Sequence, residues 1–467
     1  MTMVTANRRM AALMLMVGSA TGCAVGPDYH RPSIDIATAY KEDQGWKPTE
    51  PSDAINRGPW WEIFKDPDLD QLEAQIDISN QNVRAAAAAV EEAQALVREA
   101  TAGFWPTIAA NFGRQRSFAQ PDHTQTVNSA GLTGSWNLDI WGQIRRSTES
   151  NKASEQSTAA ALAAARLAAQ GELATDYFQL RTQDQLQALL NDTVVAQELS
   201  LKITESRYKF GVAAKADVVT AQTQLLTSQA QQVNAGVQRA LLEHAIAVLI
   251  GRQPSAFALS PKSMRGDVPT VPAGLPSALL ERRPDIAEAE RKVAAANAQI
   301  GVARAAFFPA LTLTGSNDYS GGSISKLIRA TNRTWAFGPS VVETLFAGGL
   351  HRAQAAAARA AFEASVDSYR QTVLAGLQQV EDELATLRIL EKQSAIEEEV
   401  VKAAQEAEAL TLNQYKAGTV PYSSVISAQT TTLSSREAAL TVLVNRLNAS
   451  VSLIEALGGG WEASQLQ

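Results

Sequence analysis

The sequence has one cysteine and four histidines in 467 residues, too few and too scattered to supply the ligands of a metal site or cofactor. It also lacks a nucleophile paired with a base and a phosphate-binding loop, so no enzyme class is indicated. The net charge of −7 argues against nucleic acid as a partner. Beyond the N-terminus, no segment reaches the roughly 18 uninterrupted apolar residues of a transmembrane helix, so we expect any membrane crossing to be a β-barrel.

Aromatic residues make up only 6% of the chain, whereas alanine is abundant and long stretches contain neither proline nor glycine. This composition indicates long helices that pack closely through small side chains. One proline-free stretch runs from Gly142 to Phe210. As a helix it would extend roughly 100 Å at about 1.5 Å per residue. Because no globular domain needs such a helix, we expect a mainly α-helical chain that is not one compact globule.

The clearest positive feature is an internal duplication. Two sets of apolar residues share a spacing of seven: Val83, Val90, Val97 and Phe104 in the first half, and Ile286, Val293, Ile300 and Phe307 in the second. The sets are offset by 203 residues (286 minus 83), which is too long for a solenoid unit. Each half is therefore expected to build the same structure. The spacing of seven predicts left-handed coiled-coil packing of its helices.

The duplication predicts the domain organisation. The first repeat covers residues 67–251 and the second covers 284–457. Each is expected to consist of a helix, two strands and a long helical hairpin. A linker at 252–283 joins the repeats, and a tail at 458–467 follows them.

Both repeats place two predicted strands after the first helix. We expect that helix to run unbroken from Pro67 to about Gly103 in the first repeat. Alternation of apolar and small polar residues with a period of two then predicts strands at 107–118, about 132–140, 311–314 and about 334–346. A turn is expected at Gly315–Ser325, and Pro339 suggests a bulge or bend in the last strand.

The N-terminus has the features of a targeting segment. Arg8 and Arg9 precede a short apolar run, and small residues then lead to Cys23. Residues 1–22 are expected to be a signal peptide, and the proline-containing residues 23–66 an extended arm. The sequence Ala-Thr-Gly-Cys at 20–23 resembles a bacterial lipobox, in which the cysteine is acylated, although a leucine is usual at position 20. The alternative is an ordinary signal peptide followed by a chance cysteine.

Each long hairpin is interrupted by the same motif. Tyr-Lys-x-Gly occurs at residues 208–211 and recurs at 415–418, 207 residues later (415 minus 208). Gly211 and Gly418 are expected to permit the chain reversal between the two helices of each hairpin.

Taken in order, these motifs resemble the TolC superfamily of outer-membrane channel-tunnels, most closely its NodT-like lipoprotein branch. The segments that carry the resemblance are Gly-Cys-Ala-Val-Gly-Pro-Asp-Tyr-His-Arg-Pro at 22–32, Arg-Arg-Pro-Asp-Ile at 282–286, the two Tyr-Lys-x-Gly turns, and Ala-Gln-Thr at 221–223 and 428–430. The resemblance covers essentially the whole chain, and its motifs recur in both halves.

The resemblance implies a homotrimer in which four strands from each protomer close a twelve-stranded membrane β-barrel. The long helices would continue as an α-helical coiled-coil tunnel across the periplasm. Closure satisfies every strand edge in lipid. The side chains expected to face lipid are Ile108, Phe112, Trp136, Leu138, Ile140, Leu311 and Leu313. Small polar residues such as Thr133, Asn137, Thr312 and Ser316 would line a water-filled lumen.

The function implied is that of a passive exit duct in an RND-type tripartite efflux system, including multidrug efflux. Its partners would be a periplasmic adaptor, or membrane fusion protein, and an inner-membrane pump that supplies the energy. The protein would lie in the outer membrane, anchored by lipid at Cys23, and would have no catalytic role. Its turns, with Tyr208, Gly211, Tyr415 and Gly418, resemble the adaptor-contacting tips of the family.

The family also places a periplasmic gate near these turns. Relatives often carry aspartates on the return helix of the second repeat, where this sequence has Ser424 and Ser427. The first repeat instead offers Lys215 and Asp217, either as a ring of three Asp217 carboxylates or as an exposed pair of the two residues. We expect packing of Tyr422 to help hold the tip closed, and the closed tip to depend less on acidic residues than in relatives.

The sequence also leaves two alternative functions open. A periplasmic adaptor or coiled-coil tether lipoprotein would also have long helices, but an adaptor should have one hairpin flanked by two β-rich halves. The outer-membrane duct of a type I protein secretion system would share the duplicated plan. The sequence does not identify the exported substrate, the pump or the adaptor.

Overall fold

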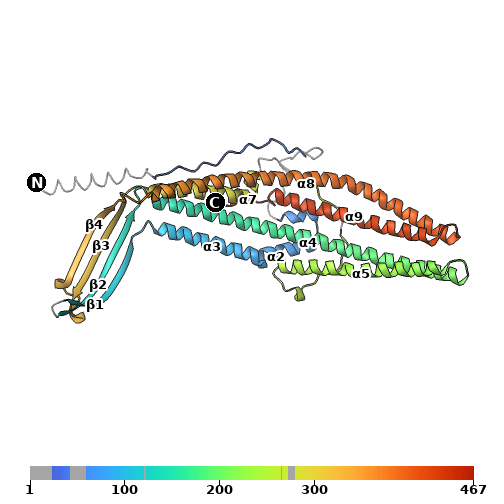
Figure 1. Cartoon of the computed structure of the whole chain (residues 1–467), viewed down its shortest axis with the longest axis horizontal. Coiled ribbons are helices and arrows are strands. Elements are labelled where there is room, and N and C mark those ends of the chain that lie inside the picture. The colour runs from blue at the N-terminus through green and yellow to red at the C-terminus, as the bar shows by residue number, and fades with distance from the viewer. Residues whose placement is uncertain (1–23, 43–58, 120–122, 265, 272–278, 467) are drawn as a thin grey trace. The chain divides into compact units, whose positions relative to one another are not determined.

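The computed structural model describes residues 24–42, 59–119, 123–264, 266–271 and 279–466 (Figure 1). The expected signal peptide and Cys23 lie outside these residues. Contacts divide the chain into two units. The first comprises the chain up to Ile34 with Ala89–Ala159 and Glu288–Gln371, and the second comprises Asp35–Ala88, Ala160–Ala287 and Thr372–Gln467.

The first unit contains an antiparallel four-stranded sheet in the order β1-β2-β3-β4 (Figure 1). Its strands are β1 (Thr107–Ala119), β2 (His123–Leu138), β3 (Ala310–Gly321) and β4 (Arg333–Val342). Each strand pairs with the next one in the chain, so the strand pair of one repeat lies directly beside that of the other. The period-two prediction of two strands per repeat is confirmed.

Two details predicted for the second strand pair are wrong. The turn expected at Gly315–Ser325 begins later than predicted, because β3 continues to Gly321 and only the residues after it connect β3 to β4. Strands on both sides pair with β3, and their hydrogen bonds hold even its small residues in an extended conformation. The register around Pro339 is unbroken, with Pro339 opposite Leu313. Within one protomer β4 pairs on one side only, so a residue without an N–H breaks no pairing on its outer side.

The N-terminal segment packs on two helices of the first unit. The helices that enter this unit are α3 (Gln81–Ala102), α4 (Gln143–Lys209), α7 (Pro284–Ala305) and α8 (Leu350–Ala417). The buried Arg146 of α4 forms an ion pair of 2.8 Å with Asp28. A Cβ on Gly26 would lie only 2.6 Å from the Cα atom of Gly301 on α7, so the chain approaches this helix too closely for a larger residue.

The opening helix of the first repeat is broken, contrary to the sequence prediction. It consists of α2 (Pro67–Ser79) and α3, and Asn80 between them has an extended backbone with ψ of 122°. The Asn80 side chain accepts from the N–H groups of Asn82 and Val83, at 2.9 and 3.0 Å, and so caps α3. Its amide also donates to Leu249 O at 2.8 Å. The break is therefore fixed by a contact distant in sequence.

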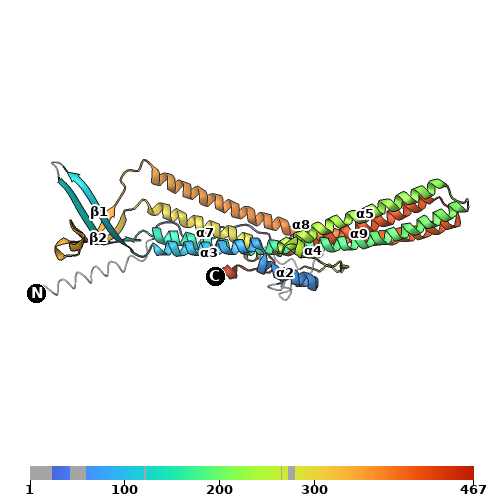
Figure 2. The same cartoon turned by 90° about the horizontal axis from the view of Figure 1, so that it is seen from below.

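The second unit contains the helical hairpins. The first joins α4 to α5 (Lys215–Leu249) and the second joins α8 to α9 (Tyr422–Ala456); α5 and α9 are both 35 residues long, as expected of a duplication. Figure 2 shows these helices side by side, and Leu189, Leu190, Ala235 and Leu433 form a core cluster between them. The shorter elements of the chain are η1 (Trp60–Phe64), η2 (Pro254–Ala256), α6 (Leu279–Arg282), η4 (Ile324–Lys326), η5 (Ala330–Asn332) and η6 (Ala463–Leu466). Among the described residues, no helix is both long and apolar enough to span a membrane.

Carboxyl groups are buried where α2, α4 and α9 meet in the second unit. Glu73 is 1% exposed, and neither of its carboxyl oxygens has a hydrogen-bond partner within the described residues. Burial, and then the charge of Glu455, raise the pKa of Glu73 well above its ordinary value. Glu455 lies against Gly171, where an added Cβ would come within 1.8 Å of Glu455 Oε1. Burial and then Glu383 raise the pKa of Glu455 to about 7, against the opposing effect of Arg283.

We predict that the chain loses stability as the pH rises from about 5 to 8. A carboxyl group with a raised pKa in the folded state contributes its stability below its ordinary pKa, here 4.5, and loses it as the pH rises through its folded value, here about 7. Glu455→Gln should therefore flatten this dependence and raise the free energy of unfolding at pH 8 by on the order of 2 kcal/mol. Thermal unfolding followed by circular dichroism in detergent at pH 5 and 8 measures both effects.

The matched control is Glu406→Gln, because Glu406 is exposed on α8. The control should leave the pH dependence as it is in the wild type. An equally steep loss of stability in Glu455→Gln would show that the buried carboxyl group is not its source.

Candidate gate and conducting surface

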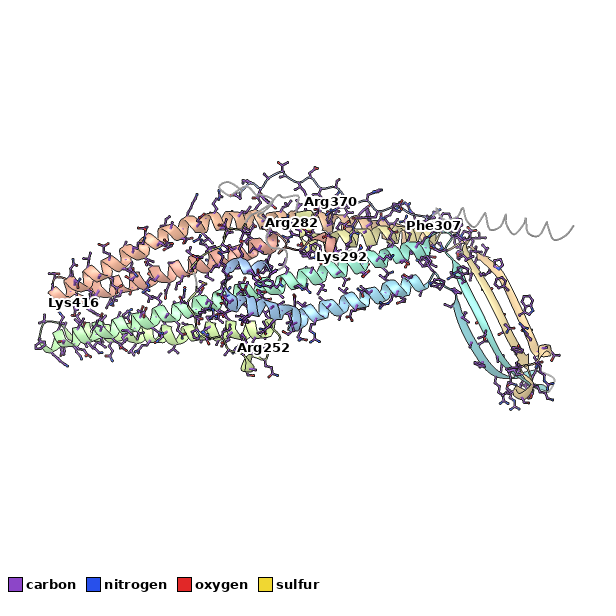
Figure 3. All side chains as sticks on the ribbon, turned by 180° about the vertical axis from the view of Figure 1, so that it is seen from behind. Arg252, Arg282, Lys292, Phe307, Arg370 and Lys416 are labelled. Atoms are coloured by element: carbon purple, nitrogen blue, oxygen red, sulfur yellow. The ribbon has the colours of Figure 1, made fainter. Side chains whose placement is uncertain are left out.

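Both hairpins turn through the same hydrogen-bonding pattern. The N–H of the turn glycine donates to a tyrosine carbonyl at 2.9 Å, Gly211 to Tyr208 and Gly418 to Tyr415. The N–H of the residue after each glycine donates to the carbonyl five residues before it, at 2.8 and 3.0 Å. The glycines have φ of +71° and +79°, in the left-handed region. Figure 3 labels Lys416 at the second of these turns.

A buried pair of tyrosines lies at the centre of the tips. Tyr415 and Tyr422 are 3% and 2% exposed, and their ring centroids are 5.3 Å apart. Ala221 of α5 and Val425 of α9 complete the buried cluster. Burial, then Tyr415, then Asp217 raise the pKa of Tyr422 to about 12, so its hydroxyl group is neutral at physiological pH.

Arg207, near the end of α4, joins the first hairpin to the second. Its guanidinium carbon lies 4.8 Å from the centre of the Tyr415 ring, and its Nη1 donates to Lys416 O at 2.9 Å. The Tyr415 hydroxyl donates to Thr204 Oγ1 at 3.3 Å. Sequence analysis missed Arg207. The available signal was a departure from the repeat, since the matching position 207 residues later is Gln414.

The other candidate gate residues have separate surroundings. Lys215 Nζ lies 5.5 Å from the centre of the Tyr208 ring. Asp217 Oδ2 accepts at 3.3 Å from the backbone N–H three residues earlier, at the start of α5. The exposed ion pair of Lys215 with Asp217 does not occur in the described part of the chain. On α9, Ser424 is half-buried and Ser427 is exposed.

The first turn exposes apolar side chains that sequence analysis did not single out. Phe210 is 81% exposed and Val212 is 63% exposed, on either side of Gly211. The matching residues of the second turn are the smaller Ala417 and Thr419. The first tip therefore presents an apolar surface that the second does not.

Most residues predicted to face lipid lie together on one face of the sheet. Cross-strand pairing brings together the side chains of Ile108, Phe112, Trp136, Leu138, Leu311 and Leu313. Ile140 does not belong to this face, because β2 ends at Leu138 and Ile140 lies in a bend beyond it. The face also includes Trp335, Phe337 and Val341 of β4. Phe112 and Trp335 are 83% and 72% exposed in the single chain.

The opposite face of the sheet is formed by small and mostly polar side chains. They include Thr107, Asn111, Ser129, Thr133, Ser135, Asn137, Thr312, Thr314 and Ser316. The hydroxyl of Thr312 donates to Asn137 Oδ1 at 3.0 Å. The four residues expected to line a lumen, Thr133, Asn137, Thr312 and Ser316, thus share one face.

Comparison with known proteins identifies similar chains over almost the whole length. The model of the family described as outer membrane efflux protein matches residues 73–252 and 275–459. The probable efflux pump outer membrane protein TtgC of Pseudomonas putida is 30% identical over 454 residues, or 94% of this chain and 93% of TtgC. The solvent efflux pump outer membrane protein SrpC of Pseudomonas putida is 32% identical over 464 residues, or 97% of this chain and 98% of SrpC. The solved structure of the outer-membrane channel OprN, 30% identical, has a TM-score of 0.88 and covers 94% of this chain and 100% of its own.

We predict that Arg207→Gln, which introduces the residue of the second repeat, loosens the contact between the hairpin tips. The change removes both the charge over Tyr415 and the bond to the Lys416 carbonyl. Amide hydrogen exchange at the two turns should become faster by about fivefold or more, as expected when about 1 kcal/mol of local stability is lost. Lys202→Gln, at an exposed position of α4, is the control and should exchange like the wild type. Unchanged exchange in Arg207→Gln would assign the contact between the tips to tyrosine packing alone.

Proposed function

The chain belongs to the outer membrane efflux protein family, and we propose that it is the outer-membrane channel of a tripartite efflux system. This bears out the resemblance to the TolC superfamily. In this role the protein is a homotrimeric duct that lies in the outer membrane and extends into the periplasm. A periplasmic adaptor connects it to an inner-membrane pump of the RND type, and the pump supplies the energy. The duct itself performs no catalysis.

This proposal rests on the sheet, which has one exposed apolar face, one polar face and two outer strands. Within one protomer β1 and β4 each pair on one side only. The unpaired backbone groups of such strands cost several kcal/mol each in lipid, so the sheet must be closed. Three protomers supply the twelve strands of a closed barrel, with the apolar face toward lipid and the polar face toward the lumen.

The helical hairpins support a tunnel rather than an adaptor. An adaptor of the kind considered above has one hairpin between two β-rich halves. The described chain has two hairpins, α4 with α5 and α8 with α9, and one sheet. Three protomers would contribute six hairpins to one tunnel, with small side chains allowing close packing of the helices.

For the periplasmic gate, we propose that the paired tips within each protomer form its structural unit. Tyr422 packs in this unit, and Asp217 fixes the start of α5 through one carboxylate oxygen. Threefold assembly would place three copies of Asp217 and Lys215 near the tunnel mouth. Ser424 and Ser427 would add hydroxyl groups to this region.

The two turns are proposed as the adaptor contact. Gly211 and Gly418 hold the chain reversal, and Tyr208 is 44% exposed beside the first turn. Tyr415 is almost fully buried and so supports the second turn from inside rather than touching an adaptor. The exposed Phe210 adds an apolar anchor, which favours the first tip as the stronger contact.

Acylation of Cys23 is proposed from the position of its neighbours. The Val25 N–H donates to Trp141 O at 3.0 Å, and a Cβ on Gly142 would lie 2.8 Å from Ala24. Trp141 and Gly142 join β2 to α4. The chain immediately after Cys23 is thus held where the strands end, which is where an acyl chain would enter the membrane.

We predict that a charge on the apolar face disrupts the assembled channel, whereas the same charge on the polar face does not. Phe112→Lys should cost on the order of 2–4 kcal/mol near the middle of the membrane and reduce the amount of trimer. Thr133→Lys is the matched control, because Thr133 lies on the polar face of β2. Unboiled outer-membrane samples on gels measure the heat-modifiable trimer. Equal trimer yields from both variants would contradict the assignment of faces, and a monomeric wild type would contradict the duct itself.

Replacement of Cys23 by serine is predicted to remove the lipid without preventing assembly. Metabolic labelling with an alkyne-modified fatty acid should detect the wild type and not Cys23→Ser. The trimer should persist, because the barrel rather than the acyl chain spans the membrane. A labelled Cys23→Ser variant would place the lipid elsewhere, and an unlabelled wild type would rule out acylation.

A further inference from the structure

The polar face of the sheet carries one charged side chain in the described strand residues 107–118, 124–138, 310–321 and 333–342. That residue is Asp318 of β3. The arginines of the strands, Arg114, Arg116 and Arg333, alternate onto the opposite, apolar face. Because every protomer repeats the same strands, closing a barrel adds no basic residue from these segments to the polar face.

Asp318 occupies a defined position in a row that crosses the sheet. Asn111, Gly131, Asp318 and Thr334 lie opposite one another on the four strands. A Cβ on Gly131 would come within 1.8 Å of Asp318 Oδ1, so the carboxylate lies over the glycine of β2. Asn111 Nδ2 approaches the same oxygen at 3.5 Å. The absence of a side chain at Gly131 makes room for the carboxylate.

The charge of Asp318 is not needed to hold the sheet together. No cation lies within ion-pair distance of it in the described part of the chain, and its hydrogen bond to Asn111 is long. The amide of an asparagine would fill the same space above Gly131. Asp318 therefore leaves an uncompensated negative charge on a face that is otherwise neutral.

We propose that Asp318 makes the barrel lumen selective for cations, including cationic small molecules on their way out. This inference rests on the proposed function, because it requires three protomers whose polar faces enclose water. Three carboxylates at one level would then form a ring, an arrangement that attracts cations and repels anions in water-filled pores. The selectivity of the channel would be set in its barrel as well as at its periplasmic tip.

The proposal has a specific dependence on salt. The Debye length is about 30 Å at 10 mM ionic strength and about 3 Å at 1 M, so a ring of fixed charges acts across a lumen only at low salt. Asp318→Asn should therefore lower the permeability ratio of K⁺ to Cl⁻ by about threefold or more near 10 mM KCl. At 1 M KCl the variant and its parent should have the same ratio.

The experiment uses trimers in planar lipid bilayers, with reversal potentials measured across a KCl gradient. All variants are made in an Asp217→Asn background, so that the tip carboxylate does not dominate the selectivity. Asp318→Asn removes the charge, and Asp318→Lys should turn the preference toward anions. Thr334→Val is the control, because it alters the same row without changing charge and should keep the K⁺ preference of its parent.

The outcomes separate the inference from the function on which it rests. A loss of K⁺ preference in Asp318→Asn, reversed in Asp318→Lys and absent in Thr334→Val, supports the proposal. Conducting trimers with the same permeability ratio in Asp318→Asn at both salt concentrations would overturn it and leave the duct intact. An unmodified chain that forms no trimer in the outer membrane would instead overturn the proposed function.

Discussion

The rest of the structure depends on one constraint, which is that the outer strands of a sheet in lipid must find partners for their backbone groups. One protomer supplies four strands in an unbroken register, with β1 and β4 at the edges. The two faces of the sheet also require closure, because a flat sheet in the membrane would expose its polar face to lipid. Closure around a threefold axis satisfies both requirements. A single protomer therefore cannot form the barrel without two other copies of the chain.

The duplication gives the protomer two hairpins of nearly equal length, and some of the residues at which they differ lie at the tips. Arg207 in the first repeat corresponds to Gln414 in the second, and Asp217 corresponds to Ser424. The guanidinium of Arg207 reaches across to Tyr415, whereas the matching residue of the second repeat, Gln414, carries no charge. The hairpins of a protomer are thus held together by this contact in addition to the buried cluster around Tyr415 and Tyr422.

The local sequence pattern predicted the helices and strands. The features that it missed depend on contacts between residues distant in sequence. Alternation with a period of two is a property of neighbouring residues, so both strand pairs and the apolar face of β1 were predicted from it. The break at Asn80 was missed because it depends on the carbonyl of Leu249, which the helical pattern does not contain. Arg207 was missed for the same reason, since its partner belongs to the other repeat. The resemblance predicts a gate near the turns, and the sequence analysis named Tyr422 as a packing residue there, but not its neighbour Tyr415 or the contact with Arg207.

The contact between the hairpin tips is formed by groups whose charge does not change near neutral pH. Arginine side chains are charged throughout this range. Burial raises the pKa of Tyr422 to about 12, so its hydroxyl group does not change its charge between pH 5 and 8. The cation–π contact and the tyrosine packing are therefore the same at pH 5 and at pH 8. The serines on α9 do not titrate in this range either. A dependence of the second unit on pH is instead expected from the carboxyl groups buried between α2, α4 and α9, where burial raises the pKa of Glu455 to about 7 and stability is lost as the pH rises. Such a contact fits the proposal of a gate that an adaptor opens by displacing these groups, rather than one that opens on a change of protonation.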